Sequence, residues 1–262
     1  MRKLSPEEET IWNQGERLIP GVTHDLAEVI RHKSSYLFFR KVLEWDFSTL
    51  RQEANPVQII DLGCGVGYGC RILSTIPNSH VLGIDASPES LEYARCHYAG
   101  ANIAYQVENL IQFIPAMPES DYVVSRGVFE HIQDGLCLAL STKCRHRLLF
   151  DVPYRESRGK NPHHVVFEFC EETFSGFHEM EFFFQDLEGV IYPRAHKPPN
   201  PNMMICVRSH PKLPKVSDSP IPFPCSAWEP EMEVGPQGWA WSRITRRLRK
   251  GLGKVVDLRK NR

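Results

Sequence analysis

The sequence predicts an α/β fold built on a mostly parallel sheet with helices on both faces. Short apolar runs alternate with segments of helical periodicity between residues 57 and 151. The first two runs end in Asp61 and Asp85, and a glycine-rich turn follows the first. Alternating strands and helices favour parallel pairing, because the chain must cross back over the sheet between strands. A chain of 262 residues fits one such domain with extensions.

The expected elements follow in order along the chain. Residues 1–50 form a predicted N-terminal helical extension, since apolar residues recur at helical spacing with an interruption at 19–21. A predicted core domain covers 51–208, where Ser87 before Pro88 is a favourable helix start. Strands are expected near 57–61, 81–85, 103–107, 121–125, 146–151, 181–186 and 203–208, and helices near 68–76, 88–98 and 130–143. The last two strands should pair as a terminal antiparallel hairpin, which makes the predicted sheet seven-stranded.

The turn after the first strand reads Asp61-Leu62-Gly63-Cys64-Gly65-Val66-Gly67. Glycine lets bare backbone approach a ligand, because it has no Cβ. An acid at the end of the second strand, here Asp85, can accept both hydroxyls of a ribose. The G-x-G-x-G spacing differs from the dinucleotide fingerprint, and no Gly-Lys-Ser/Thr follows to make a P-loop. The turn therefore predicts a site for a nucleoside derivative.

The pattern D-x-G-x-G-x-G, with an acidic end to the second strand, resembles class I S-adenosylmethionine-dependent methyltransferases. The resemblance continues in family order through residues 105–109, 121–132 and 147–154. It implies a Rossmann-like class I methyltransferase fold and S-adenosylmethionine as the cofactor.

The same resemblance implies a set of cofactor contacts. Asp61 should orient the amino end of the cofactor, and Asp85 should bind the ribose hydroxyls. Glu108 and Asn109 stand at the third-strand station, where the usual Gly-Asp is replaced by Glu-Asn. The predicted cofactor-binding residues are Asp61, Gly63, Cys64, Gly65, Gly67, Asp85, Ala86, Glu108, Asn109 and Arg126.

Two histidines are candidate catalytic bases. Methyl transfer from a sulfonium is an in-line displacement, and a hydroxyl acceptor must also lose its proton. His131 follows the fourth strand, while His164 matches the histidine of the family's Asn-Pro-x-His element. An imidazole titrates near neutrality, so it can take that proton. The structural alternatives are a capping role for His131 and a loop-anchoring role for His164. No metal site is expected, and the predicted substrate contacts are Asp151, Tyr154, His163, Arg17 and Tyr36.

Two segments of the N-terminal extension bear on the acceptor. Residues 15–20 and the pattern His32-x-x-x-Tyr36 resemble the leader of bacterial methyltransferases encoded with surface-polysaccharide genes. The resemblance implies a glycan or small-molecule acceptor in polysaccharide biosynthesis, with O-methylation as the specific expectation. The alternatives are a quinone, a lipid or a protein side chain as acceptor, or a non-catalytic scaffold that binds a nucleoside.

The composition and the cysteine pattern of the chain favour one cellular compartment. Hydrophobic residues make up 42% and charged residues 24%, as in ordinary globular proteins, and no apolar run approaches membrane-spanning length. The acidic start of the chain does not resemble a signal peptide. The eight cysteines include no C-x-x-C pair, which favours buried thiols in a reduced, cytoplasmic compartment.

The C-terminal region changes character twice. Residues 209–238 are proline-rich and predict a linker, and residues 239–262 form a basic amphipathic segment. Residues 242–262 carry nine Lys/Arg and one Asp, although the whole chain has a net charge of −1. The segment is interpreted as a disordered tail or as a helix that lies on anionic lipid at the inner membrane face. Nucleic acid is not expected as a partner, because the remaining chain is acidic.

Overall fold

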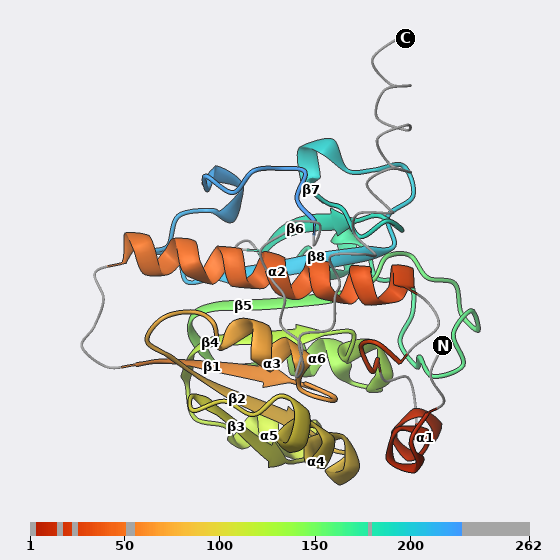
Figure 1. Cartoon of the computed structure of the whole chain (residues 1–262). Helices are drawn as coiled ribbons and strands as arrows, with labels where there is room; N and C mark the ends of the chain where they lie inside the picture. Colours follow the sequence, from red (N-terminus) through yellow and green to blue (C-terminus); the bar gives the residue numbers. More distant parts are fainter. Residues whose placement is uncertain (1–3, 15–17, 23–25, 51–55, 178–179, 227–262) are drawn as a thin grey trace, which may run out of the picture. The chain divides into compact units, whose positions relative to one another are not determined.

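The computed structural model describes residues 4–14, 18–22, 26–50, 56–177 and 180–226 (Figure 1). The predicted substrate contact Arg17 and the basic segment 239–262 lie outside these residues. The helices are α1 (Pro6–Asn13), α2 (Leu26–Thr49), α3 (Tyr68–Leu73), α4 (Pro88–His97), α5 (Leu110–Ala116) and α6 (Gly135–Ser141). Short 3₁₀ turns are η1 (Phe129–His131), η2 (Glu171–Phe174), η3 (Arg194–His196) and η4 (Val216–Asp218).

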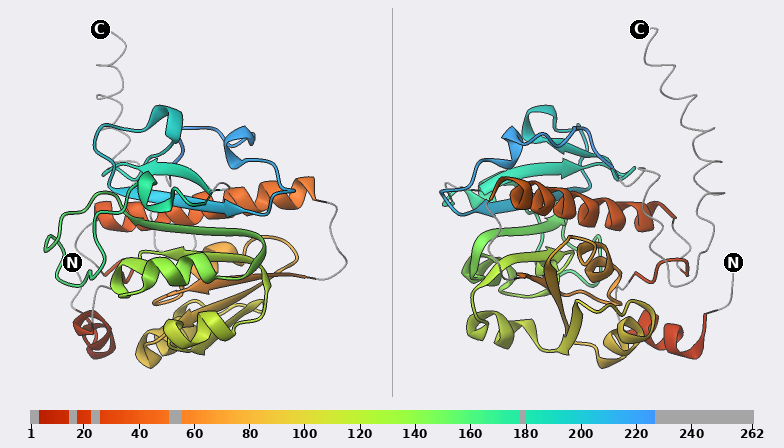
Figure 2. Two further views of the ribbon diagram at one scale, coloured as in Figure 1. Left: turned by 180° about the vertical axis from the view of Figure 1, so that it is seen from behind. Right: turned by 60° about the vertical axis from the view of Figure 1, so that its left-hand side comes forward.

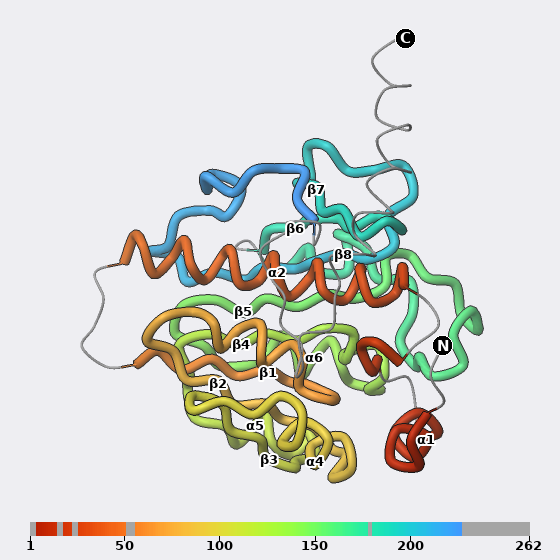
Figure 3. Tube along the Cα trace, in the orientation of Figure 1, coloured from red at the N-terminus to blue at the C-terminus, as the bar shows by residue number. Residues whose placement is uncertain are grey.

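The strands form one sheet in the order β3-β2-β1-β4-β5-β8-β6-β7. They are β1 (Val57–Leu62), β2 (Ser79–Asp85), β3 (Ile103–Val107), β4 (Ser120–Arg126), β5 (Cys144–Pro153), β6 (Met180–Gln185), β7 (Ile191–Pro193) and β8 (Met203–Ser209). β1 to β5 pair in parallel, and β8 lies antiparallel between β5 and β6 although β6 and β7 precede it in sequence (Figure 3). The α/β fold class and the antiparallel end of the sheet are therefore confirmed.

Three details of the prediction were wrong. The sheet has eight strands rather than seven, because the three-residue strand β7 adds to the outer edge by pairing with β6. Helix α5 was not predicted, since it is short and contains Pro115. The helix expected at 130–143 is divided into η1 and α6, because Ile132 is extended (φ −116°, ψ 127°) and α6 begins only at Gly135. A Cβ on that glycine would lie 1.9 Å from the carbonyl oxygen of Phe129.

Helices cover both faces of the sheet (Figures 1 and 2). Side chains alternate between faces along a strand. Asp61 of β1 therefore points to α2 and α3, where it accepts hydrogen bonds from Tyr36 and Cys70. Its neighbours Ile60 and Leu62 point the other way, into the main apolar core. That core includes Leu110 and Ile114 of α5, Leu138 and Ala139 of α6, and Leu148, Phe150 and Val152 of β5.

A buried ion pair joins α2 to the middle of the sheet. Arg147 of β5 donates from Nε and Nη2 to the two carboxylate oxygens of Asp46 at 2.7 and 2.9 Å, and both side chains are fully buried. Arg147 also donates to the carbonyl oxygen of Pro214 at 2.8 Å. This clamp fixes the helix that crosses the sheet above the candidate site.

Residues 209–226 differ from an open linker. The backbone N–H of Val216 donates to Glu181 at 2.7 Å, and Cys225 forms a β-bridge with Ile191. The ring of Phe223 stacks on Phe183 with centroids 5.4 Å apart. This part of the proline-rich region therefore packs against the antiparallel end of the sheet. Its remaining residues, 227–238, lie outside the described part of the chain.

None of the described helices combines the length and the apolar character that crossing a bilayer requires.

Candidate active site

The glycine turn connects β1 to α3 in a conformation that favours glycine. Gly63, Gly65 and Gly67 have φ values of +71°, +53° and +83°, all in the left-handed region. The N–H groups of Gly63 and Cys64 donate to the carbonyl oxygen of Ile84 at 2.8 and 2.9 Å. The turn is therefore anchored to the end of β2, the neighbouring strand.

Asp85 holds this turn from the carboxyl end of β2. Its Oδ2 accepts the Gly65 N–H at 2.9 Å, and its Oδ1 accepts the Ser87 N–H at 2.9 Å. The side chain is 7% exposed. Each carboxylate oxygen has two lone pairs and can accept more than one hydrogen bond. Asp85 thus fixes the turn, and its predicted contact with ribose stays a prediction.

The three glycines differ in their surroundings. A Cβ on Gly63 would lie 2.3 Å from Val128, and one on Gly67 would lie 2.6 Å from the Tyr105 hydroxyl. A Cβ on Gly65 would meet no atom within 4 Å. The turn therefore packs against protein at Gly63 and at Gly67, and it is open at Gly65. Cys64 is buried, so its backbone rather than its thiol is suited to a ligand.

We predict that Gly65→Ala lowers cofactor affinity at least tenfold, because the added methyl group occupies the open side. Gly159→Ala is the matched control, since Gly159 also has a positive φ (+81°) and open space around it. Both variants should lose about 1–2 kcal/mol of stability from left-handed strain. Calorimetric titration and thermal unfolding measure the two effects. Equal cofactor affinity in the two variants would contradict a ligand at this turn.

Asp61 lies buried beneath the turn. Its Oδ1 accepts the Tyr36 hydroxyl at 3.1 Å, and its Oδ2 accepts the Cys70 thiol at 3.2 Å. Burial raises the pKa of Asp61 to about 7, and the nearby charge of Asp85 acts in the same direction. The bonds from Tyr36 and Cys70 partly oppose this shift of the pKa. A cationic group near Asp61 would favour its ionised form.

The raised pKa of Asp61 predicts a pH dependence of stability. The folded protein binds the Asp61 proton more tightly than the unfolded chain, whose carboxyl titrates near 3.8. This contribution is therefore complete below pH 4 and is lost as the pH rises toward about 7. We expect Asp61→Asn to flatten the decline in melting temperature between pH 5 and 7.5. An unchanged slope in the variant, measured by thermal unfolding in matched buffers, would rule out this assignment.

Tyr36 was predicted as a substrate contact, and the structure places it under the turn. It is 3% exposed, and its ring packs where a Cβ on Gly69 would lie, 2.1 Å away. Its hydroxyl bonds Asp61. The residue therefore joins α2 to the glycine turn, and its contact with substrate stays a prediction.

Arg126, at the end of β4, joins the sheet to α2. Its Nη1 contacts His32 Nε2, and its Nε lies 3.7 Å from Asp151 Oδ2. His32 Nδ1 lies 2.9 Å from the Tyr68 hydroxyl. Asp151 is fully buried and accepts bonds from Ser35 at 2.7 Å and from the Gly127 N–H at 2.8 Å. Arg126 and Asp151 are thus brought together at the carboxyl edge, with the N-terminal half of α2 above them.

The predicted adenine contacts lie at the ends of β2 and β3. Ala86 and Asn109 are exposed, and Glu108 is half-buried. The Glu108 N–H donates to the Asp85 carbonyl oxygen at 3.0 Å, which places Glu108 beside the predicted ribose-binding residue. Asn109 accepts the Ile111 N–H at 2.9 Å and so caps α5.

The two candidate histidines lie together. The rings of His131 and His164 meet edge to face with centroids 4.7 Å apart. The N–H groups of Val165 and Val166 donate to the Glu130 carbonyl oxygen at 2.8 and 3.0 Å, which ties the loop of His164 to η1. The carboxylate of Glu130 lies in the same cluster. Sequence reasoning missed Glu130, although it directly precedes His131.

The loop around His164 is built from its own polar groups. His164 Nδ1 contacts Glu156 Oε2, and its Nε2 lies 3.1 Å from Asn161 Nδ2. His163 is exposed, and its carbonyl oxygen lies 3.0 Å from His131 Nδ1. Glu156 is a second residue that the sequence did not indicate, because a carboxylate eight residues away in a loop carries no recognisable spacing.

Tyr154 lies farther along the same edge. Its hydroxyl donates to Glu171 Oε2 at 2.8 Å and lies 3.0 Å from Lys197 Nζ. It is half-buried, so its predicted contact with substrate stays a prediction.

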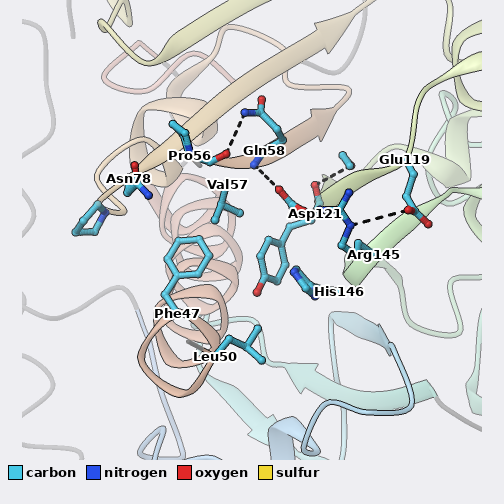
Figure 4. A pocket seen from close by; sticks show the side chains of 13 residues that line it. Phe47, Leu50, Pro56, Val57, Gln58, Asn78, Glu119, Asp121, Arg145 and His146 are labelled. Carbon is cyan, nitrogen blue, oxygen red and sulfur yellow. Dashed lines mark hydrogen bonds and ion pairs between the residues drawn. The ribbon is translucent and has the colours of Figure 1, made fainter. Parts of the chain in front are cut away.

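A cavity of about 410 Å³ lies at the opposite edge of the sheet, where β1, β4 and β5 begin (Figure 4). Its wall includes Asp121, which accepts the Gln58 N–H at 2.9 Å and Arg145 Nη1 at 2.7 Å. Open parallel sheets bind ligands outside the carboxyl ends of their strands. The cavity is therefore separate from the candidate site.

Comparison with known proteins agrees with this geometry. Residues 59–148 match a family model described as a methyltransferase domain. A ubiquinone biosynthesis O-methyltransferase of Sinorhizobium medicae (strain WSM419) is 31% identical over 86 residues, which cover 32% of this chain and 34% of that protein. A malonyl-[acyl-carrier protein] O-methyltransferase of Hahella chejuensis (strain KCTC 2396) is 29% identical over 87 residues, or 33% of this chain and 31% of the relative. The chain spans about a third of the length of these relatives.

Solved structures share the fold at low sequence identity. The plantazolicin methyltransferase BpumL in complex with SAH superposes with a TM-score of 0.54 at 14% identity, covering 78% of this chain and 91% of that one. The N-terminal domain of EvdMO1 in the presence of SAH and D-fucose gives 0.50 at 11% identity, covering 77% and 95%. The structure thus has the Rossmann-like class I methyltransferase fold. The match of residues 59–148 to the methyltransferase-domain model agrees with this fold.

Proposed function

We propose that this protein transfers the methyl group of S-adenosylmethionine to a hydroxyl oxygen of a sugar or other small-molecule acceptor. The observation that carries the proposal is the glycine turn, which Asp85 holds with its Gly65 side open. A loop of this kind presents backbone to a ligand without an intervening Cβ. The structural neighbour BpumL is described in complex with SAH, the demethylated product of this cofactor.

The surrounding residues suit the parts of the cofactor. Asp85 and the turn lie together for the ribose, and Ala86 and Glu108 lie beside them for the adenine. Asp61 lies beneath the turn, at the place proposed for the amino end. A positively charged ammonium group there would favour the ionised carboxylate that burial otherwise disfavours.

In this reaction the acceptor oxygen attacks the methyl carbon as the S–CH₃ bond breaks, so the two must lie in line. The acceptor hydroxyl also loses its proton. The cluster of Glu130, His131 and His164 supports this step, because it lies after β4 next to the residue that touches the turn, Val128. The side chains of this cluster can accept the proton or lower the pKa of the acceptor hydroxyl.

The choice of a hydroxyl acceptor is supported by the matched proteins. Both curated relatives are named as O-methyltransferases. The N-terminal domain of EvdMO1 is described with SAH and D-fucose, which supports a sugar as the acceptor. The ubiquinone biosynthesis relative favours a quinone-type phenol as the second candidate.

Transfer of a labelled methyl group tests the proposal. The purified chain is incubated with methyl-labelled S-adenosylmethionine and, in separate reactions, nucleotide-sugars, oligosaccharides, catechols and a fractionated cell extract. We expect label in a sugar-containing product. Label in the lipid fraction would favour the quinone candidate. Cofactor binding with no labelled product in any fraction would favour the non-catalytic scaffold.

We also propose a cytoplasmic location with peripheral contact to anionic membrane through residues 239–262. The support is the sequence alone, with nine basic residues in 242–262. Sedimentation with phosphatidylglycerol vesicles, compared with neutral vesicles, measures this contact. Removal of 239–262 should abolish co-sedimentation, and unchanged sedimentation would contradict the proposal.

A further inference from the structure

Three potential metal ligands converge where β4 ends. One ligand atom each from Glu130, His131 and His164 lies within 4.8 Å of the others. An ion bound at about 2.0–2.2 Å sets neighbouring ligands roughly 3–3.5 Å apart. Small side-chain rotations would therefore close the cluster around an ion. A carboxylate and two imidazoles are a common donor set for divalent first-row metals with open coordination positions.

The buried carboxylate of Glu130 is incompletely hydrogen-bonded in the described structure. The residue is 2% exposed, and its Oε2 is buried without a hydrogen-bond partner among the described residues. Buried carboxylate oxygens are normally paired, because desolvation is costly. In the described structure Glu130 Oε2 has no such partner. A cation between Glu130 and the histidines would supply that partner.

Both histidines are oriented as metal ligands usually are. His131 Nδ1 lies 3.0 Å from the His163 carbonyl oxygen, and His164 Nδ1 contacts the Glu156 carboxylate. An oxygen acceptor at Nδ1 places the proton there and leaves a lone pair on Nε2. Asn161 Nδ2 lies 3.1 Å from His164 Nε2, in keeping with an unprotonated nitrogen. A metal at that nitrogen must displace this amide.

The cluster lies beside the glycine turn. Val128, two residues before Glu130, is the side chain that a Cβ on Gly63 would strike at 2.3 Å. A Cβ on Gly127 would lie 3.5 Å from Glu130 Oε1. A cation here would therefore lie on the same edge as the proposed methyl donor.

We propose that Glu130, His131 and His164 bind one divalent first-row metal ion, which holds the acceptor hydroxyl oxygen at an open coordination position. The role in catalysis rests on the function proposed above, whereas metal binding itself does not. An ion with open positions lowers the pKa of a coordinated hydroxyl. The proton leaves to solvent, the O–CH₃ bond forms as the S–CH₃ bond breaks, and the sulfonium becomes the neutral thioether of S-adenosylhomocysteine. The proposal replaces the expectation of no metal and makes the two histidines ligands rather than bases.

The test titrates chelator-treated full-length protein with MnCl₂ and follows free Mn²⁺ by electron paramagnetic resonance. CoCl₂ provides a second probe, whose visible absorption reports nitrogen ligation. We expect about one site per chain, with at least tenfold weaker binding in Glu130→Gln and in His131→Asn. His196→Ala, an exposed histidine on η3, is the control and should bind as the parent does. His131 is half-buried, so His131→Asn still tests the site if the buried Glu130→Gln variant misfolds.

Absence of binding at millimolar metal, or equal binding by the parent and both cluster variants, would overturn the proposal. Calorimetry with S-adenosylmethionine on the same samples keeps the two proposals distinct. If the chelated protein binds cofactor and methylates at an unchanged rate, the metal proposal fails and the methyltransferase proposal stands. If metal binds at the cluster and neither cofactor binding nor methylation is found, the metal site stands and the enzymatic role fails.

Discussion

Replacing Asp46 with alanine is expected to destabilise the protein by about 3–5 kcal/mol, because it leaves the guanidinium of Arg147 buried without its counter-charge. Both side chains have zero exposure, and two hydrogen bonds of 2.7 and 2.9 Å join them. The pair links residues 101 positions apart, so its loss also removes one of the links between α2 and β5. Urea unfolding followed by circular dichroism measures the change.

Glu44→Ala provides the matched control on the same helix. Glu44 pairs with Arg40 at 2.7 Å in an i, i+4 arrangement, and both side chains are partly exposed. Partly exposed helical pairs contribute about 0.3–0.5 kcal/mol. A loss below 1 kcal/mol for Asp46→Ala would show that the buried pair is not what holds α2 in place.

Asp85→Ala is expected to weaken binding of S-adenosylmethionine at least 100-fold, or by about 2.7 kcal/mol. The substitution removes two interactions together. The glycine turn loses the acceptor of the Gly65 N–H, and the proposed ribose hydroxyls lose their carboxylate. Calorimetric titration measures the affinity, and thermal unfolding shows whether the variant remains folded.

Glu89→Gln is the control for this experiment. Glu89 is an exposed acid on the first turn of α4, the helix that follows Asp85. Its substitution should leave the affinity for S-adenosylmethionine within threefold of the parent value. Near-parental affinity in Asp85→Ala would place the cofactor elsewhere on the protein.

The elements with strong local patterns were predictable. Strands β1 to β5 are short apolar runs, and the glycine turn is specified by residue type at fixed spacing, so both could be located from sequence. Helix α5 could not, because Pro115 interrupts a segment of only seven residues. Strand β7 depends on pairing with β6 and with Cys225, and these contacts leave little trace in a three-residue stretch.

In the candidate site, too, some residues could be predicted from the sequence and others could not. The positions of Asp61, Asp85 and Arg126 at strand ends follow from the alternation of strands and helices. The pairing of Tyr36 with Asp61 and of His131 with His164 depends on how distant segments pack. Glu130 was missed because a glutamate in sequence is most often a solvated side chain. Only its burial, with an unpartnered Oε2 in the described structure, draws attention to it.

Isothermal calorimetry tests the proposed cofactor site most directly. The purified, full-length protein is titrated with S-adenosylmethionine and with S-adenosylhomocysteine. We predict saturable binding of both compounds at one common site, with each displacing the other and with Gly65→Ala and Asp85→Ala impaired. Absence of binding heat for either compound at several temperatures, or binding that both variants retain in full, would contradict a cofactor site at the glycine turn.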